Sequence, residues 1–112
     1  MNVKTAIADS FVKLENDEYV FFIDKDFPAF KGHFPRYPLL PGIVQIEIAL
    51  FCISMRLNKE AKLAEIVKTK FIKPALPDTE LCVSLSGTGE IFDITVKDAN
   101  EIYSHMRLRV AV

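Results

Sequence analysis

The sequence predicts a single α+β domain in which a curved antiparallel sheet wraps around one long helix. Residues 41–57 form an almost wholly apolar run of good helix formers, whereas three stretches after residue 80 alternate between apolar and polar positions. A period of two is typical of a half-buried strand, and a helix that is apolar nearly all round has to be enclosed. One sheet cannot enclose a helix completely. We therefore expect a second subunit to cover what the sheet leaves exposed.

Length and composition set the outer limits of the prediction. The chain of 112 residues is long enough for one core, and we treat residues 1–112 as one domain. Hydrophobic residues make up 50% and charged residues 26%, as in an ordinary globular protein. The net charge of −1 gives no bulk field for nucleic acid or an anionic membrane. The longest nearly uncharged run, Leu39 to Met55, is too short and too polar for a membrane span.

Two further features place the protein in a cell compartment. The N-terminal residues contain no apolar stretch long enough for a secretory signal. Cys52 and Cys82 lie in apolar surroundings and lack metal-ligand spacing. We expect both to be reduced, buried thiols of a cytoplasmic protein, with no metal bound.

The first half of the chain is predicted to hold a strand, a loop and the helix. The section up to about Asp24 is mixed, and within it the aromatic and β-branched segment "EYVFFI" indicates a strand. Four of the six prolines fall between Phe27 and Pro41, which predicts an ordered but irregular loop. Pro41 or Gly42 suits the start of the helix, which should run to Leu57.

The second half is predicted to be β-structure. "AEIVKTKFIKPAL" indicates a strand that ends near Pro74, and "ELCVSLSG", "IFDITV" and "IYSHMRLRVAV" indicate three more. "GTG" at 87–89 and "KDAN" at 97–100 are predicted turns. In the alternating strands, one face should be buried by the residues Leu81, Val83, Leu85, Phe92, Ile94, Val96, Ile102, Ser104, Met106, Leu108 and Val110.

Glu47 is the first candidate for chemistry, because it interrupts the apolar helix. An ionised carboxylate in an enclosed apolar helix is costly unless it is paired or protonated. One explanation is a salt bridge to a lysine or arginine across an interface, or an exposed position on the helix. The functional alternative is a carboxylic acid kept neutral by desolvation, which can donate a proton near pH 7.

His33 is the second candidate, in the proline-rich loop next to Gly32. A loop histidine by itself is more often a solvated side chain than a catalyst. Together with Glu47 it has the character of an acid–base pair, in which the environments of the two side chains shift their pKa values apart. His105 is different, because it falls on the polar face of the last strand beside Arg107; we expect it to be solvated and not catalytic.

The prolines at 35, 38 and 41 allow two interpretations. They could form a polyproline II ligand for a partner domain, or they could stiffen the loop and set the helix start. We favour the second, because Leu39 and Leu40 would be exposed in a free ligand. The Gly42 N–H then lies at the helix start without an intrahelical partner and can polarise a carbonyl oxygen. An acid, a base, such an N–H and apolar surroundings suit chemistry next to a carbonyl group, such as loss of a proton and a hydroxyl beside a thioester.

The segment "GHFPRYPLLPGIVQIE" resembles the active-site motif of the bacterial 3-hydroxyacyl-(acyl carrier protein) dehydratases. That motif is roughly G-H-F-P-x-x-P-x-x-P-G, followed by a short apolar run and an acid. Glu47 lies fourteen residues after His33, and Gly42 lies nine after it, as in the motif. "KFIKPALPDTEL" at 70–81 is similar to the family's next strand and turn. The resemblance covers residues 31–81, and the rest of the chain matches only in pattern.

This resemblance implies a hotdog fold with the helix at its centre and a homodimer, or a higher homo-oligomer, with active sites at the subunit interface. His33 would take the C2 proton, Glu47 of the partner subunit would protonate the departing 3-hydroxyl, and the Gly42 N–H would hold the thioester carbonyl. No cofactor or metal is implied. The family also implies a cis peptide bond after His33. The acyl chain would lie beside the helix, which makes Phe34, Pro41 and Ile43 candidate substrate contacts.

The substrate implied by the resemblance arrives on acyl carrier protein, which is acidic and should meet a local basic patch. Candidates for that patch are Lys31, Arg36, Lys70 and Lys73, all of which could equally be ordinary solvated charges. Arg36 departs from the family, in which a glycine is common, and its bulk could narrow the entrance. The short chain resembles the compact dehydratase-like proteins of specialised acyl pathways such as aryl polyene synthesis.

Two other functions compete with a dehydratase in fatty acid or specialised acyl synthesis. A hotdog thioesterase would use the helix acid to activate water and needs no histidine at position 33. A non-catalytic acyl-binding or interaction module would be favoured by loss of a catalytic residue, and both His33 and Glu47 are present.

Overall fold

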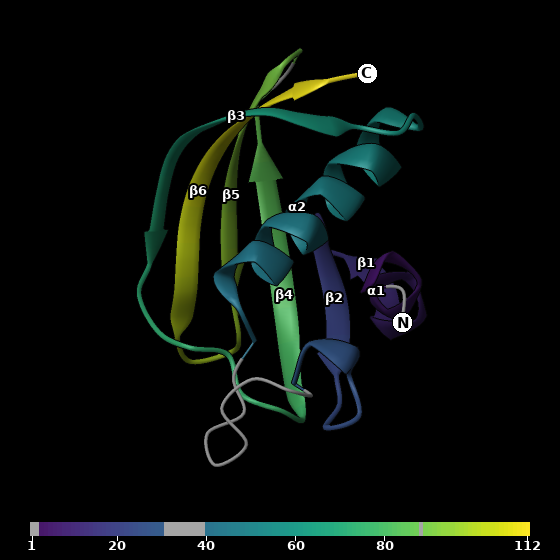
Figure 1. Cartoon of the computed structure of the whole chain (residues 1–112), viewed down its shortest axis with the longest axis vertical. Coiled ribbons are helices and arrows are strands. Elements are labelled where there is room, and N and C mark those ends of the chain that lie inside the picture. Colours follow the sequence, from purple (N-terminus) through teal and green to yellow (C-terminus); the bar gives the residue numbers. More distant parts are fainter. Residues whose placement is uncertain (1–2, 31–39, 88) are drawn as a thin grey trace.

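The computed structural model describes residues 3–30, 40–87 and 89–112. The elements follow one another as α1 (Val3–Ser10), β1 (Phe11–Glu15), β2 (Glu18–Ile23), the 3-10 turn η1 (Pro28–Phe30), α2 (Gly42–Leu57), β3 (Lys62–Phe71), β4 (Thr79–Ser86), β5 (Ile91–Lys97) and β6 (Ile102–Ala111). The strands form one antiparallel sheet in the order β1-β2-β4-β5-β6-β3, and α2 lies across one face of it (Figure 1). The predicted α+β architecture is confirmed.

Helix α2 begins and ends close to the predicted residues. Pro41 has extended backbone angles (φ −59°, ψ 147°) and Gly42 is the first helical residue. At the other end Asn58 adopts a left-handed conformation (φ 55°), and its N–H donates to the carbonyl of Met55 at 3.3 Å. Asparagine tolerates this conformation better than most residues, so it ends the helix cleanly.

The core lies between α2 and the sheet. From the helix it takes Val44, Ile46, Ile48, Ala49, Cys52 and Ile53, and from the sheet chiefly Phe21, Leu81, Val83, Phe92, Ile94 and Leu108. Burial of such side chains is the main source of stability, and truncation of one of them to alanine costs about 2–5 kcal/mol. Cys52 is buried as predicted, and this burial raises the pKa of its thiol. Cys82 is only half-buried, which corrects the prediction for that residue.

The alternation predicted for the strands is confirmed in β4 and β5, where the expected residues are buried. It fails at the start of β6, because Ile102 is exposed and Tyr103 is buried. The pairing passes from Val96–Ser104 to Lys97–Ile102, so Tyr103 is the extra residue of a bulge. A bulge changes the face to which neighbouring side chains point, and this irregularity is not encoded by a simple period of two.

The N-terminal region contains more structure than the sequence analysis predicts. Helix α1 packs next to α2 and contributes the buried side chain of Ile7. Strands β1 and β2 form a hairpin in which Asn16 and Asp17 both have positive φ (52° and 61°). Two consecutive left-handed residues are the signature of a type I′ turn, which matches the twist of a hairpin.

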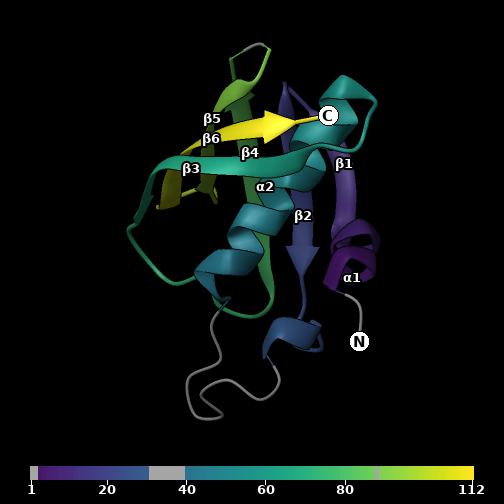
Figure 2. The same cartoon turned by 45° about the horizontal axis from the view of Figure 1, so that its top comes forward.

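Strand β3 forms one edge of the sheet and is exposed along its whole length. It starts beside the C-terminal end of α2 and follows the rim of the sheet (Figure 2). It ends at Phe71, before the predicted Pro74, because the N–H groups of Ile72 and Lys73 both donate to the carbonyl of Tyr103, at 2.8 and 3.2 Å. The chain then passes the helix start, where the Leu40 N–H donates to the Ala75 carbonyl at 2.7 Å.

Candidate active site

The start of α2 presents N–H groups without intrahelical acceptors. The first helical bonds are those of Val44 and Gln45, whose N–H groups donate to the Pro41 carbonyl at 3.0 and 3.3 Å. The N–H groups of Gly42 and Ile43 precede these bonds and are available to an acceptor outside the helix. The dipole of a 16-residue helix adds positive potential at the same end. A carbonyl oxygen that gains negative charge would be stabilised there.

Gly42 is held against the end of β3. A Cβ atom at this position would lie 2.7 Å from Cζ of Phe71, which is closer than real Cβ contacts. The aromatic ring therefore approaches the helix backbone directly. Glycine at this position has a packing reason as well as a chemical one.

A cavity of about 370 Å³ opens beside this contact. It is lined by Leu40, Gly42, Gln45, Phe71, Ile72, Lys73 and Pro74. Among the described lining residues, Leu40, Phe71, Ile72 and Pro74 are apolar, whereas Gln45 and Lys73 carry polar side chains. An apolar wall with few convergent polar groups is typical of a small-molecule site.

Glu47 lies on another side of the same helix. It is half-buried and lines a second cavity, of about 500 Å³, together with Lys4, Ile7, Leu50, Phe51, Ser54, Glu60, Ala61, Lys62 and Leu63. Lysine and glutamate side chains are mixed around this cavity, and the aromatic ring of Phe51 packs on Phe11 and Phe21 behind it. Glu47 thus has access to open space within one chain, and both interpretations offered by the sequence remain predictions.

Among the described residues of one chain, Glu47 and Gly42 line different cavities. Five residues along an α-helix correspond to a rotation of about 140° between the two positions. A site shared by two subunits stays a prediction.

Several predicted site residues fall outside the described part of the chain. These are Lys31, His33, Phe34 and Arg36, together with the predicted cis bond after His33. Among the described candidates, Pro41 is half-buried at the helix start, whereas Ile43 is 61% exposed. An exposed isoleucine at this position is what an interface or a bound acyl group would cover.

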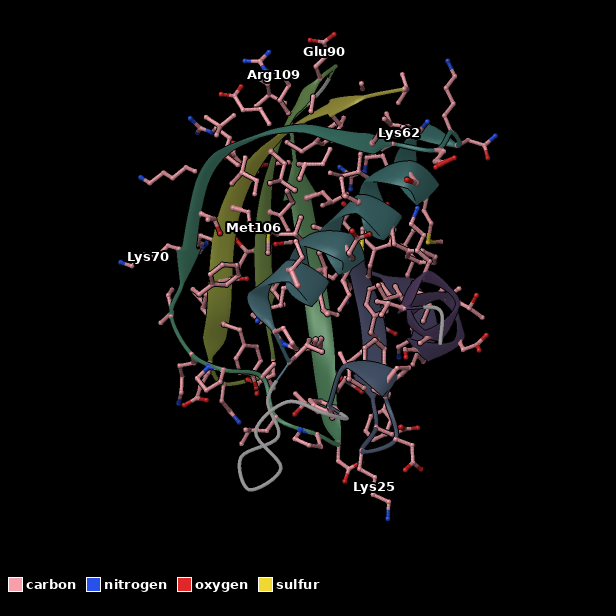
Figure 3. All side chains as sticks on the ribbon, viewed as in Figure 1. Lys25, Lys62, Lys70, Glu90, Met106 and Arg109 are labelled. Carbon is pink, nitrogen blue, oxygen red and sulfur yellow. The ribbon has the colours of Figure 1, made fainter. Side chains whose placement is uncertain are left out.

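The two described lysines of the predicted basic patch differ in their surroundings. Lys70 projects from the outer flank of β3, away from α2 (Figure 3), and lines a cavity together with Lys68, Asp93 and Arg107. Lys73 lies in the cavity wall at the helix start and forms an ion pair with Glu101. His105 is exposed, as predicted, and its Nδ1 lies 3.1 Å from Oγ1 of Thr95.

The turn that carries Glu101 anchors this side of the cavity. The Tyr103 hydroxyl donates to the carboxylate of Asp98, which also accepts the N–H groups of Asn100 and Glu101 at 2.7 Å each. These three hydrogen bonds lower the pKa of Asp98, and the bond from Tyr103 has the largest effect. Burial is the main cause that raises the pKa of Tyr103, and the hydrogen bond to Asp98 is the next largest. Since the Tyr103 carbonyl holds Ile72 and Lys73, this turn positions two residues of the cavity wall.

Sequence reasoning did not assign roles to Phe71, Gln45 or this turn. Gln45 carries the one signal that could have been used, since an amide in an apolar helix needs a partner or a purpose. No helix in the described ranges is long and apolar enough to cross a membrane.

Comparison with known proteins identifies the family. The model of the ApeI-like family, described as ApeI dehydratase, matches residues 12–107. The 3-hydroxyacyl-(acyl-carrier-protein) dehydratase FabZ of Geobacter metallireducens is 36% identical in an alignment 72 positions long, which covers 55% of this chain and 47% of that protein. FabZ of Solibacter usitatus is 31% identical in an alignment 85 positions long, which covers 67% of this chain and 52% of that protein. The chain thus spans about half the length of these curated relatives.

Solved structures show the same fold. The dehydratase heterocomplex ApeI:P from Xenorhabdus doucetiae has a chain that superposes with a TM-score of 0.76 at 22% identity, covering 85% of this chain and 86% of that one. A protein from Erwinia carotovora subsp. atroseptica superposes with a TM-score of 0.68 at 24% identity, covering 90% of each chain. With one long helix laid on a curved antiparallel sheet and a family match over most of its length, this chain is a hotdog-fold member of the ApeI-like dehydratase family.

Proposed function

We propose that the protein removes water from a 3-hydroxyacyl thioester on acyl carrier protein and releases a trans-2-enoyl thioester. The observation that carries this proposal is the helix α2. Its first residue, Gly42, lines a cavity whose described walls are mostly apolar, and the same helix presents Glu47 five residues later on another side. Family membership and the FabZ relatives support the same reaction class.

In the proposed reaction His33 takes the proton from C2 of the acyl chain. The electron pair of that C–H bond becomes the C2–C3 double bond, and the C3–O bond breaks. Glu47 of the partner subunit gives its proton to the departing hydroxyl, which leaves as water. The Gly42 N–H stabilises the negative charge that develops on the thioester oxygen. The balance requires no metal, cofactor or oxidant, and Phe34, Pro41 and Ile43 would contact the substrate.

The proposed assembly is a homodimer with two shared sites. Support comes from the exposed edge strand β3, which carries the exposed apolar side chains Leu63, Ile66, Val67 and Phe71. An unpaired edge of this composition favours pairing with another strand. Pairing of β3 with its copy would extend the sheet and bring two α2 helices near each other.

Acyl carrier protein is the proposed carrier of the substrate. Lys70 and Lys73, with Lys31 and Arg36, supply the positive charge that an acidic carrier requires. Lys73 lies in the cavity wall, which suits a contact at the mouth of the site. Two free thiols, Cys52 and Cys82, support a reducing compartment, and we place the reaction in the cytoplasm, in fatty acid or aryl polyene synthesis.

One assay distinguishes this proposal from its competitors. The protein is incubated with a 3-hydroxyacyl-carrier thioester while enoyl absorbance and free thiol are followed together. Enoyl without thiol is expected for the dehydratase. Thiol without enoyl would instead identify a thioesterase. If neither forms across a series of acyl chains on carrier protein, the proposed activity is wrong and an acyl-binding module is favoured.

A further inference from the structure

Two polar side chains lie in the described part of the core, and they are bonded to each other. Gln45 on α2 is 2% exposed and Ser104 on β6 is fully buried. The Ser104 hydroxyl donates to Oε1 of Gln45 at 2.7 Å. This pair lies beneath the start of α2, since Ser104 is the cross-strand neighbour of Phe71, whose ring touches Gly42.

Stability alone does not explain this pair. A buried hydrogen-bonded pair contributes little net stability, and its replacement by two apolar groups of similar shape is often nearly neutral. A glutamine carboxamide also has two N–H donors besides its oxygen. Among the described residues, Ser104 is the one hydrogen-bond partner of the Gln45 side chain, and its hydroxyl donates to the carboxamide oxygen.

The position of Gln45 suggests where its donors are used. Gln45 is three residues after Gly42, and positions three apart share a helix face. Both residues line the 370 Å³ cavity, and of its other described lining residues all but Lys73 are apolar. Because Ser104 holds the carboxamide by its oxygen, the amide nitrogen is the part left to face an acceptor in this cavity. In apolar surroundings such a donor interacts strongly with a developing negative charge.

We propose that the Gln45 carboxamide donates a second hydrogen bond to the thioester carbonyl oxygen that the helix start receives. This inference rests on the proposed function and extends its carbonyl-binding site. Gln45 then touches the substrate, while Ser104 is a positioning residue that keeps the amide nitrogen toward the cavity. The two donors stabilise the charge that forms on the carbonyl oxygen as the C2 proton leaves, and they transfer no atom themselves.

The test uses a probe that cannot be dehydrated. A saturated acyl-pantetheine thioester, labelled with ¹³C at its carbonyl, is bound to the protein and its carbonyl stretch is recorded by infrared difference spectroscopy. In the wild type the stretch should shift to lower frequency than in water, because hydrogen bonds weaken the C=O bond. In the double variant Gln45→Met/Ser104→Ala, which is apolar at both positions, much of this shift should be lost.

Ser104→Ala alone serves as the matched control for positioning. It keeps the Gln45 donors but frees the amide to rotate, so the carbonyl band should broaden and lie between the other two. In turnover of a 3-hydroxyacyl thioester, the double variant should lose about 10²-fold in kcat with KM changed only a few-fold, as expected for an oxyanion donor. A purely structural role would lower the melting temperature and leave the band of the folded fraction where it was.

A second measurement needs no variant and covers the case in which the double variant does not fold. The wild type should bind the thioester probe at least tenfold more tightly than the matching thioether, which lacks the carbonyl oxygen. Equal binding of the two compounds, or an identical carbonyl band in wild type and folded double variant, overturns the role of Gln45. Dehydration without a Gln45-dependent band defeats this inference alone, whereas a Gln45-dependent band without dehydration defeats only the proposed function.

Discussion

The ring of Phe71 packs against Gly42 so closely that a Cβ atom on Gly42 would lie 2.7 Å from Phe71 Cζ. The contact joins the end of the edge strand β3 to the start of α2, where the carbonyl oxygen of the substrate is proposed to bind. Phe71 is 46% exposed, so its ring has room to move outward when it is pushed. The relationship therefore couples the shape of the cavity to a side chain at the edge of the sheet.

Gly42→Ala should impair turnover more than stability. The added methyl group displaces the Phe71 ring, and we expect the free energy of unfolding to change by less than about 1 kcal/mol because the half-exposed ring can rotate. The methyl group also crowds the donors at the helix start, so kcat should fall about tenfold or more. Adding Phe71→Leu should recover part of kcat, with Phe71→Leu alone as the control. No recovery in the double variant would mean that the ring contact is irrelevant to the site.

Two inactive variants should restore activity when they are mixed. His33→Ala and Glu47→Gln should each lower turnover by about 10²-fold or more, since a positioned acid or base contributes 10²–10⁴. Random exchange makes about half of the dimers mixed, and each mixed dimer holds one intact site of two, so about a quarter of wild-type activity should return. Native mass spectrometry monitors the exchange. Complete exchange without recovered dehydration would rule out a site shared between subunits.

The assembly should depend on β3. Light scattering at micromolar concentration should give at least twice the chain mass for the wild type. Ile66→Lys places a charge on the exposed edge strand and should lower the measured mass to that of one chain. Val12→Lys is the matched control, because Val12 is an exposed apolar residue on β1, at the opposite edge of the sheet. A wild-type monomer that remains well folded would contradict the shared-site model.

The basic patch should matter for carrier-bound substrate only. Lys70→Glu is expected to raise KM for a carrier-bound substrate about threefold to tenfold, and to leave KM for the corresponding pantetheine thioester unchanged. The effect should fade as salt is added, because exposed charges are screened. Lys25→Glu, at a different part of the molecular surface (Figure 3), is the control. Equal effects on both substrates would show that Lys70 does not contact the carrier.

The Asp98 turn should make stability depend on pH in the acid range. Hydrogen bonds from Tyr103 and two backbone N–H groups lower the pKa of Asp98 in the folded protein. Its contribution is therefore present above the unfolded value, about 3.9, and is lost as pH falls through the lower folded value. Asp98→Asn should be less stable than wild type at pH 6, and the gap should close in stronger acid. Denaturant unfolding at several pH values measures this.

Two variants complete the pH experiment. Tyr103→Phe removes the hydroxyl that donates to Asp98, and the free energy of unfolding should therefore depend less on pH, as in Asp98→Asn. Asp26→Asn, at an exposed position, is the control for loss of one carboxylate. A gap between wild type and Asp98→Asn that stays constant from pH 6 downward would mean that the turn is not held by the ionised carboxylate.

Much of the fold could be predicted from the chain because its strongest signals are local. The apolar run from Gly42 to Leu57 is a helix with nearly the predicted bounds, and the alternating residues of β4 and β5 bury the expected face. Helix α1 was missed because its eight residues carry a weak apolar pattern and depend on packing against α2. The bulge at Tyr103 was missed because a bulge is set by pairing between strands.

For the site, the kinds of chemical group could be read from the chain, whereas their meeting points depend on the tertiary fold. Glu47 and the Gly42 helix start could be named from residue type, spacing and resemblance, because an acid in an apolar helix and a glycine after proline are unusual locally. That they line different cavities of one chain depends on how α2 lies on the sheet. The contacts Phe71–Gly42 and Ser104–Gln45 join residues far apart in the chain, and no local pattern specifies them. Long-range contacts of this kind exist only after the core has closed, since burial and not sequence proximity brings their partners together.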